Sequence, residues 1–399
     1  MEILKFKSIN ELISTAESWS HSCKKCKSLN EMDEYETKFI IGIYEIIFDK
    51  IPLLKCTSCG EINVPPFTIE MVNYVYSEMV NRCIYNHLVK SSNYHEKYDY
   101  CKKLSLVYSH HDYECIPGLK SSSEDGFLVP VYFNRKILSI LMNLPEYQVD
   151  WFSEGYGCIS KNDEWHNIVF GINSNGKVFM WLGDLDCLDE ETQRYFEINN
   201  VDSDHKLIDS DFYRAQMLSL WSQPKRDRFV FTNRNKFYDN VMKKYSINLY
   251  HLKKECDEKK KTFNSPVLYS DSEMKNSIEI LHQYCIEGIS IKELKKLYFQ
   301  LDSTKTPQDV NDLKSIKLLQ LVFELLYSAL DTSSFLSPLY LLNDLRIIFC
   351  HLLPDEEIIK LKENLLRTLS IDTFDNRLIY DSLIERLNRL YTYFAQANE

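Results

Sequence analysis

The feature that most constrains this chain is a doubled Cys-x-x-Cys pattern near its start. One pair is Cys23 and Cys26, and the other is Cys56 and Cys59. Each pair alone fits a redox site or a disulfide staple, but two pairs together supply the four thiolates of a closed tetrahedral metal site. Most of the remaining cysteines among the twelve are scattered singly, which is typical of a reducing compartment. We therefore expect these four residues to bind a structural Zn²⁺ that stabilises folding and performs no chemistry.

The segment between the two pairs has the composition of a small sheet. YETKFIIGIYEIIFDKIPLL, residues 35–54, is dominated by Ile, Tyr, Phe and Thr, which favour strands. Gly42 and the Asp49-Lys50 step are the expected turns. These observations predict a small β-rich zinc-binding module over residues 1–95, with flanking helices.

The second Cys pair carries a family resemblance. The stretch IPLLKCTSCGEINVPPFTIEMVNYVYSEMV is similar to the YgiT or MqsA type of bacterial zinc domain, in which a Val-Pro or Ile-Pro step precedes CxxCGE and a helix. The matching residues are Ile51, Pro52, Cys56, Cys59, Gly60 and Glu61. In that family the domain often belongs to an antitoxin and contacts a partner protein. The resemblance covers about the first quarter of the chain and implies a bacterial interaction or regulatory protein.

Composition excludes several other classes. The chain has 399 residues, of which 44% are hydrophobic, so it can bury more than one core. Its formal net charge of −11 makes non-specific binding of duplex DNA unfavourable. Because no apolar run reaches the length of a membrane span and MEILKFKSINELIS lacks the apolar core of a signal peptide, we expect a cytoplasmic protein with no membrane segment.

Residues 96–225 differ in composition from the preceding segment and predict a mixed α/β module. Asn175-Gly176 separates the apolar runs 168–173 and 177–182, which is a strong β-hairpin signal. RKILSILMNL, residues 135–144, predicts a helix.

A polar cluster within this module allows two interpretations. Asp202, Asp204, His205, Asp209 and Asp211 lie within ten positions and could bind a divalent metal. Their spacing matches no calcium loop, so the favoured interpretation is that Ser210 or Asp211 caps a helix beginning at Phe212. The pairs His110-His111 and Trp165-His166 are interpreted as ordinary loop or strand residues.

The last part of the chain predicts helices. Residues 226–264 are rich in both charges and predict a solvated helical linker, and residues 265–399 predict an antiparallel helical bundle. Apolar residues recur there at spacings of three and four over six segments. Expected helix starts are Thr306-Pro307, Ser337-Pro338 and Pro354-Asp355. The predicted fold class is therefore multidomain α+β, with a zinc module, a mixed α/β module and an all-α bundle.

One bundle segment carries a second resemblance. NDLRIIFCHLL contains Arg346 and His351 at an R-x4-H spacing, which resembles the active motif of HEPN-type ribonucleases. That resemblance implies an all-α dimer in which the histidine moves the ribose 2′ proton and the arginine stabilises phosphate charge. The alternative is structural, with Arg346 paired to Asp344 or Glu357 and His351 in a polar gap.

Two functions remain open at this point. The first is a zinc-binding interaction or regulatory protein of a bacterial phage-defence or toxin-regulation system, acting on another protein, on itself or on a ligand. The second is a metal-independent ribonuclease that uses Arg346 and His351, with RNA as its substrate.

Overall fold

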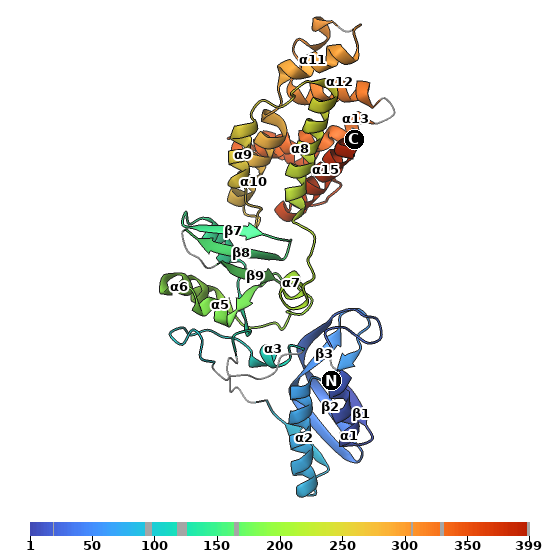
Figure 1. Cartoon of the computed structure of the whole chain (residues 1–399), viewed down its shortest axis with the longest axis vertical. Coiled ribbons are helices and arrows are strands. Elements are labelled where there is room, and N and C mark those ends of the chain that lie inside the picture. Colours follow the sequence, from blue (N-terminus) through green and yellow to red (C-terminus); the bar gives the residue numbers. More distant parts are fainter. Residues whose placement is uncertain are drawn as a thin grey trace. The chain divides into compact units, whose positions relative to one another are not determined.

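The chain folds into two compact units. The computed structural model describes residues 1–18, 20–91, 98–117, 126–162, 167–304, 306–327 and 331–396. Met1–Gln223 form the first unit and Pro224–Glu399 the second (Figure 1). Both β-sheets belong to the first unit, and the second is helical within its described residues. The predicted α+β class, with sheets in the N-terminal half and helices in the C-terminal half, is confirmed.

The first unit begins with a five-stranded sheet built on one long hairpin. β2 (Asn30–Ile41) and β3 (Tyr44–Cys56) run antiparallel around Gly42, whose φ of +61° suits a residue without a Cβ atom. β1 (Glu2–Phe6) adds parallel to β2, while β4 (Ile62–Asn63) and β5 (Asn86–Val89) both pair with β3. Residues 35–54 are therefore mostly strand, as predicted.

The second expected turn is wrong. Asp49-Lys50 does not reverse the chain, because β3 continues through both residues. The pairing shifts from Thr37–Phe48 to Tyr35–Ile51, so these two residues oppose Glu36 alone. This is a β-bulge, which places one extra residue in a strand without ending it.

Two helices cover this sheet. α1 (Ile9–Ser14) and α2 (Pro66–Asn81) bury Leu12, Val72 and Met79 against the apolar face of β2 and β3. The expected helix after the second Cys pair is α2, whose first residue is a proline that needs no hydrogen-bond acceptor there.

The rest of the first unit contains a six-stranded sheet in which every pair is antiparallel, in the order β11-β6-β10-β9-β8-β7. The predicted hairpin around Gly176 is confirmed as β9 and β10. The strands are β6 (Pro130–Phe133), β7 (Tyr147–Trp151), β8 (Tyr156–Lys161), β9 (Ile168–Ile172), β10 (Val178–Trp181) and β11 (Asn200–Val201). The helices are α3 (His110–Glu114), α4 (Lys136–Met142), α5 (Leu182–Asp186), α6 (Glu190–Asn199) and α7 (Asp211–Leu218).

The two sheets of the first unit share a core. Met32 and Leu54, from β2 and β3, pack in one buried cluster with Phe179 of β10 and Phe212 of α7. The segments 1–95 and 96–225, which differ in composition, thus contribute to a common apolar core within this unit.

The second unit is a bundle with one large core. Buried side chains from helices along its whole length, such as Phe237, Leu294, Leu339 and Phe394, belong to a single cluster. Its α-helices are α8 (Arg226–Tyr245), α9 (Lys253–Lys261), α10 (Asp271–His282), α11 (Ile291–Leu301), α12 (Ser315–Leu326), α13 (Thr332–Cys350), α14 (Asp355–Leu369) and α15 (Asn376–Gln396). Gln283–Glu287 form a π-helical turn after α10, and Thr15–Ser18 and Pro307–Val310 form 3₁₀ turns.

Only some helices begin where the sequence signals predict. α14 begins after Pro354, as expected. α13 begins at Thr332 with Asp331 as its cap, so the expected start at Ser337-Pro338 is wrong and Pro338 lies inside the helix. The cap satisfies the Ser334 N–H one turn before the proline, which allows the helix to begin early.

The segment expected as a charged linker also differs from its prediction. α8 spans much of residues 226–264 and places Phe231 and Val241 in the bundle core. Its Arg234 is 2% exposed and lies 3.2 Å from the ring centroid of Tyr250. Aromatic rings cover Arg234, and no acidic residue in the described ranges pairs with it. Charge patterning along the sequence does not reveal this burial.

No helix among the described residues combines the length and apolarity that crossing a membrane requires.

Candidate metal centre

The four predicted cysteines come together in the first unit. The Cys23 and Cys59 sulfurs are 3.6 Å apart, and those of Cys26 and Cys56 are 3.3 Å apart. All four ligand atoms lie within 4.8 Å of one another, so the group could hold a metal ion. Cys23 and Cys56 are buried, whereas Cys26 and Cys59 are exposed.

The long hairpin explains how distant pairs meet. The loop with Cys23 and Cys26 precedes β2, and Cys56 is the last residue of β3. Asn30 is paired directly with Cys56 in the β2–β3 register. The segment between the two pairs therefore forms one long hairpin, and the two strands bring its ends, with the two Cys pairs, close together.

The two Cys-x-x-Cys loops have the same backbone geometry. In each, the first cysteine sulfur accepts a 3.4 Å hydrogen bond from the N–H two residues later, that of Lys25 or Ser58. The carbonyl of the first cysteine accepts from the N–H of the residue after the second cysteine, at 2.9 Å from Lys27 and 3.1 Å from Gly60. Those two residues have φ of 66° and 72°. We call these two loops, residues 23–28 and 56–61, the Cys knuckles.

Hydrogen bonding in the first knuckle favours thiolates. Bonds from the Ser28 backbone N–H and hydroxyl lower the pKa of Cys26 to about 6. The backbone N–H groups of Cys26 and Lys25 lower the pKa of Cys23 despite its burial. Because the thiolate is the metal ligand, these bonds prepare the sulfurs for a cation.

The geometry suits one tetrahedral ion. Zn–S bonds of about 2.3 Å place the sulfurs of a tetrahedral site about 3.8 Å apart. The observed separations of 3.3 and 3.6 Å are close to this value and far from the ~2.05 Å of a disulfide. Both short pairs join one knuckle to the other, so neither knuckle is a self-contained redox pair.

A second group of possible ligands lies on α3. His110, His111 and Glu114 also place one ligand atom each within 4.8 Å of the others. His110 and Glu114 are four residues apart and share a helix face. The Nδ1 atom of His111 is 3.0 Å from Oε1 of Glu34, and this hydrogen bond lowers the pKa of Glu34 to about 2. The sequence pattern indicates ordinary loop or strand residues at His110 and His111, and the α3 group adds Glu114 to them. Trp165-His166 lies outside the described residues.

The acidic cluster of residues 202–211 serves structural roles. Ser210 accepts the Tyr213 N–H at 3.1 Å and caps α7, which confirms the capping prediction. Asp204 accepts from the amide of Asn173 at 2.8 Å, and Asp209 accepts from Arg214 at 2.6 Å. Across the described ranges, none of these carboxylates belongs to a group that could hold a metal.

His205, in the same cluster, lies next to a buried carboxylate. Its Nδ1 atom is 2.8 Å from Oδ1 of the buried Asp112. Burial lowers the pKa of His205, but the hydrogen bond and charge of Asp112 outweigh it, so the net shift is upward. The other oxygen of Asp112 accepts a hydrogen bond from Ser203, so both carboxylate oxygens hold the loop 203–205.

Arg346 and His351 have separate surroundings. Arg346, on α13, lies with its Nη2 atom 3.2 Å from Oε1 of Glu287, in the π-helical turn. His282 lies at the same distance from that oxygen. His351 is exposed and follows the last residue of α13. No hydrogen bond or ion pair among the described residues joins the two, and the partner of Arg346 is neither Asp344 nor Glu357.

Sequence reasoning missed Lys27 and Ser28, which support the cysteines of the first knuckle through backbone conformation and hydrogen bonds. Their roles depend on backbone direction and hydrogen bonding, and only the GE dipeptide after Cys59 signals such a turn. Comparison with known proteins adds no assignment: no family model, no curated protein and no solved structure matches this chain.

Proposed function

We propose that this chain is a zinc-binding interaction protein whose first unit associates with a second copy of itself. The Cys knuckles hold a structural Zn²⁺ with no open coordination position. The ion joins the two ends of the β2–β3 hairpin and so stabilises the sheet that carries the binding surface. The role in a bacterial phage-defence or toxin-regulation system that the zinc-domain resemblance implies belongs to this proposal.

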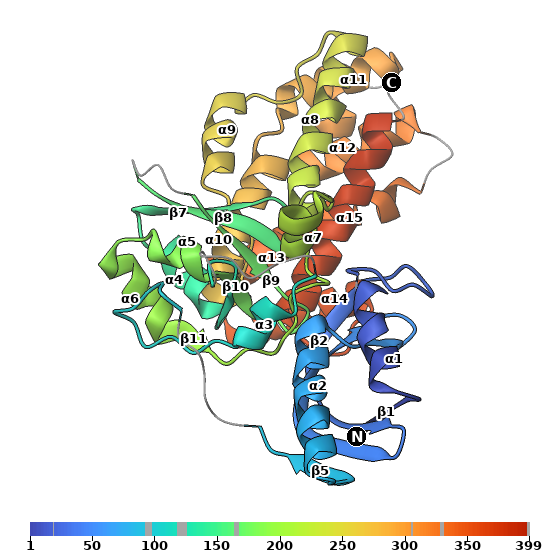
Figure 2. The same ribbon diagram turned by 60° about the horizontal axis from the view of Figure 1, so that its bottom comes forward.

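The observation that carries the interaction role is the edge of the N-terminal sheet. β5 pairs with β3 on one side, and no other strand of the described chain pairs with its second side (Figure 2). Tyr85 and Leu88 at this edge are 52% and 53% exposed, and Tyr74 on the neighbouring α2 is 69% exposed. We call Tyr74, Tyr85, Leu88 and the backbone of β5 the β5 edge.

Proteins usually protect such an edge. A lysine, a proline or a bulge normally blocks pairing with another chain, and the β5 sequence NHLV has none of them. A cavity of about 240 Å³ beside it is lined by Tyr74, Met79 and Ile84, among others. An unprotected edge with apolar side chains on the adjoining helix favours sheet extension by another strand.

A second copy is the proposed occupant, because the β5 strand carries no charge that opposes it. The whole chain carries −11, so copies repel each other over most of their surface. The segment Asn86–Val89 has no acidic residue, which makes it a place where two copies can approach without that repulsion. Two β5 strands related by a twofold axis pair antiparallel and bury both apolar patches.

Analytical ultracentrifugation tests this proposal. We expect the wild type to form a concentration-dependent dimer and Leu88→Glu to sediment as a monomer, because two carboxylates would be buried at the paired edges. Ile3→Glu is the matched control, since Ile3 is 52% exposed on β1, at the opposite edge of the same sheet. A monomeric wild type, or a dimer that Leu88→Glu leaves intact, contradicts self-association through β5.

Ribonuclease activity is the second candidate, and the exposure of His351 favours it. An exposed imidazole after α13 is accessible to the phosphodiester backbone of RNA. The test is expression of the wild type and an Arg346→Ala/His351→Ala variant in bacteria at equal soluble levels, with and without phage. RNA fragmentation by the wild type alone supports this candidate, whereas intact RNA in both strains under both conditions refutes it.

A further inference from the structure

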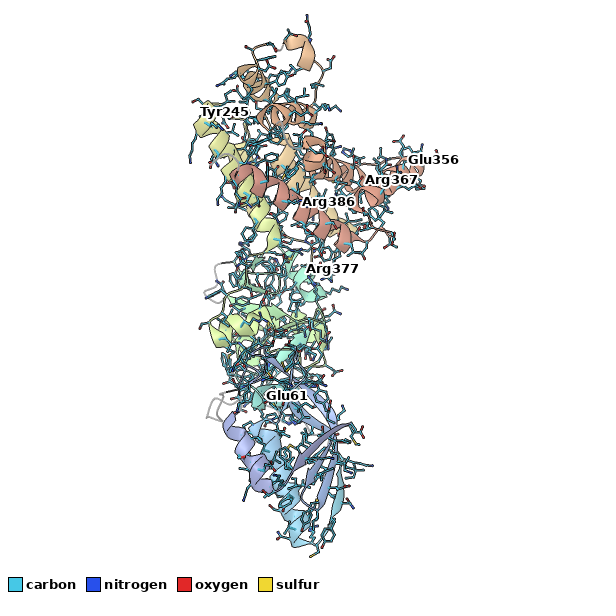
Figure 3. The ribbon with its side chains drawn as sticks, turned by 90° about the vertical axis from the view of Figure 1, so that its right-hand side faces the viewer. Glu61, Tyr245, Glu356, Arg367, Arg377 and Arg386 are labelled. Atoms are coloured by element: carbon cyan, nitrogen blue, oxygen red, sulfur yellow. The ribbon has the colours of Figure 1, made fainter. Side chains whose placement is uncertain are left out.

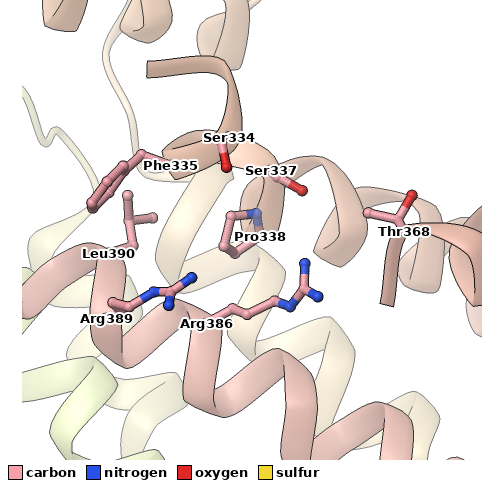
Figure 4. Close-up of a pocket in the computed structure, with 8 residues that line it drawn as sticks. All are labelled: Ser334, Phe335, Ser337, Pro338, Thr368, Arg386, Arg389 and Leu390. Carbon is pink, nitrogen blue, oxygen red and sulfur yellow. The ribbon is translucent and has the colours of Figure 1, made fainter. Parts of the chain in front are cut away.

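A pocket in the helical bundle contains two arginines that lack partners. The cavity measures about 280 Å³ and lies between α13, the end of α14 and α15 (Figure 4). Arg386 and Arg389 reach it from α15. Neither guanidinium makes a hydrogen bond or an ion pair with any residue in the described part of the chain, and no lining residue there is acidic.

Two unpaired arginines on one helix face require an explanation. Residues three apart on a helix are neighbours, and like charges at that spacing destabilise it. This chain has eleven more acidic than basic side chains, so an acidic partner for each arginine would be easy to supply. Their convergence on one cavity instead creates a local positive potential in an acidic protein.

The remaining lining residues divide the pocket into two parts. Figure 4 shows Arg386 directed toward the side of Ser337 and Thr368, which offer hydroxyl groups. Phe335 and Leu390 lie together on the other side, next to Arg389. A polar half with guanidinium and hydroxyl donors suits a phosphate group, and the apolar half suits a ring.

We propose that this pocket binds a nucleoside monophosphate. The Arg386 guanidinium and the Ser337 hydroxyl donate hydrogen bonds to the phosphate, Arg389 adds a second positive charge to the same cavity, and Phe335 and Leu390 contact the base. The cavity volume lies near the lower end of the range for small-ligand sites and admits one nucleotide rather than an oligonucleotide. Binding here is independent of the Cys knuckles and of the β5 edge.

Isothermal titration calorimetry on the full chain tests the pocket, with AMP, GMP, CMP and UMP as probes. We expect at least one nucleotide to bind one per chain, adenosine and the other free nucleosides not to bind, and inorganic phosphate to bind more weakly. Arg386→Gln/Arg389→Gln should weaken nucleotide binding by about tenfold or more, since each charge-assisted hydrogen bond is strong and glutamine carries no charge.

Arg377→Gln is the matched control. Figure 3 shows Arg377 apart from Arg386, near the start of α15 and outside the pocket. Its Nε atom is 4.0 Å from Oδ2 of Asp381. This variant should bind nucleotide as the wild type does. The double variant should not lower the thermal midpoint, because neither pocket arginine bonds to the described protein and the two like charges repel each other.

Three results would overturn the assignment. They are the absence of binding by all four nucleotides, equal affinity in the wild type and the double variant, and nucleoside binding as tight as nucleotide binding. Inorganic phosphate that binds as tightly as the best nucleotide would overturn the role given to Phe335 and Leu390.

Discussion

At the scale of single residues, the ionisation of Asp184 opposes folding. It lies in the first turn of α5, and burial raises the pKa of its carboxyl group to about 6. Its ordinary pKa is 3.8, so the folded protein holds the proton more tightly than the unfolded chain. The stability from this group is therefore present below about pH 4 and is lost as the pH rises through 6.

We predict that Asp184→Asn raises the stability of the first unit at pH 7. One pKa unit corresponds to about 1.4 kcal/mol, and because the residue is only partly buried we expect a gain of about 1–2 kcal/mol. Thermal unfolding of the wild type and the variant at pH 7 and pH 4 measures it. The difference should vanish at pH 4, where the wild-type carboxyl group is protonated. An equal difference at both pH values would show that packing, not ionisation, is responsible.

At the scale of elements, the two Cys knuckles have the same backbone geometry but different residues after the second cysteine. Each requires a left-handed conformation after its second cysteine, which Gly60 adopts freely and Lys27 adopts at a cost. The equivalent hydrogen bonds show that the backbone requirement is the same in both. The first knuckle is therefore the more strained of the two.

This asymmetry predicts opposite effects of two substitutions on zinc affinity. Gly60→Ala should weaken it and Lys27→Gly should strengthen it, each by about 1 kcal/mol or roughly fivefold. Competition with a chromogenic zinc chelator measures both. Lys24→Gly is the control, because Lys24 is exposed in the same knuckle without a positive φ. A similar gain for Lys24→Gly would mean that charge or flexibility, not the left-handed position, controls the affinity.

At the scale of the whole molecule, the division into two units limits what a metal at the Cys knuckles can stabilise. The Cys knuckles and the β2–β3 hairpin belong to the first unit, and the bundle has its own core. A metal that closes the ends of a hairpin contributes its binding energy to the folding of that hairpin.

We therefore predict that removal of the proposed zinc ion loosens the first unit alone. Hydrogen–deuterium exchange with peptide resolution, with and without a chelator, should show faster exchange in β2 and β3 and unchanged exchange in α8 and α15. Cys26→Ser should reproduce this pattern with zinc present. Cys187→Ser should not, because Cys187 is an exposed cysteine outside the metal group. Faster exchange throughout the bundle would contradict independent units.

Some features of this molecule could be predicted from the sequence because they depend on neighbours in the chain. The thiol spacing, the Asn175-Gly176 turn and the 3.6-residue periodicity of α14 and α15 are local, and the structure reproduces all of them. The bulge at Asp49-Lys50 and the early start of α13 were missed, since each depends on pairing or capping that outweighs the local turn signal.

Other features were decided only by tertiary structure. Met32 and Leu54 read as residues of the zinc module, yet they complete the core beneath the second sheet. Arg386 and Arg389 lie in a segment that the sequence predicts only as part of a helical bundle, and the packing of α13 and α14 against α15 places them at one cavity. The sequence alone determined which elements form and which thiols can share an ion, because those depend on spacing along the chain. Tertiary structure decided which surfaces remain without partners, because that depends on contacts between residues far apart in the chain.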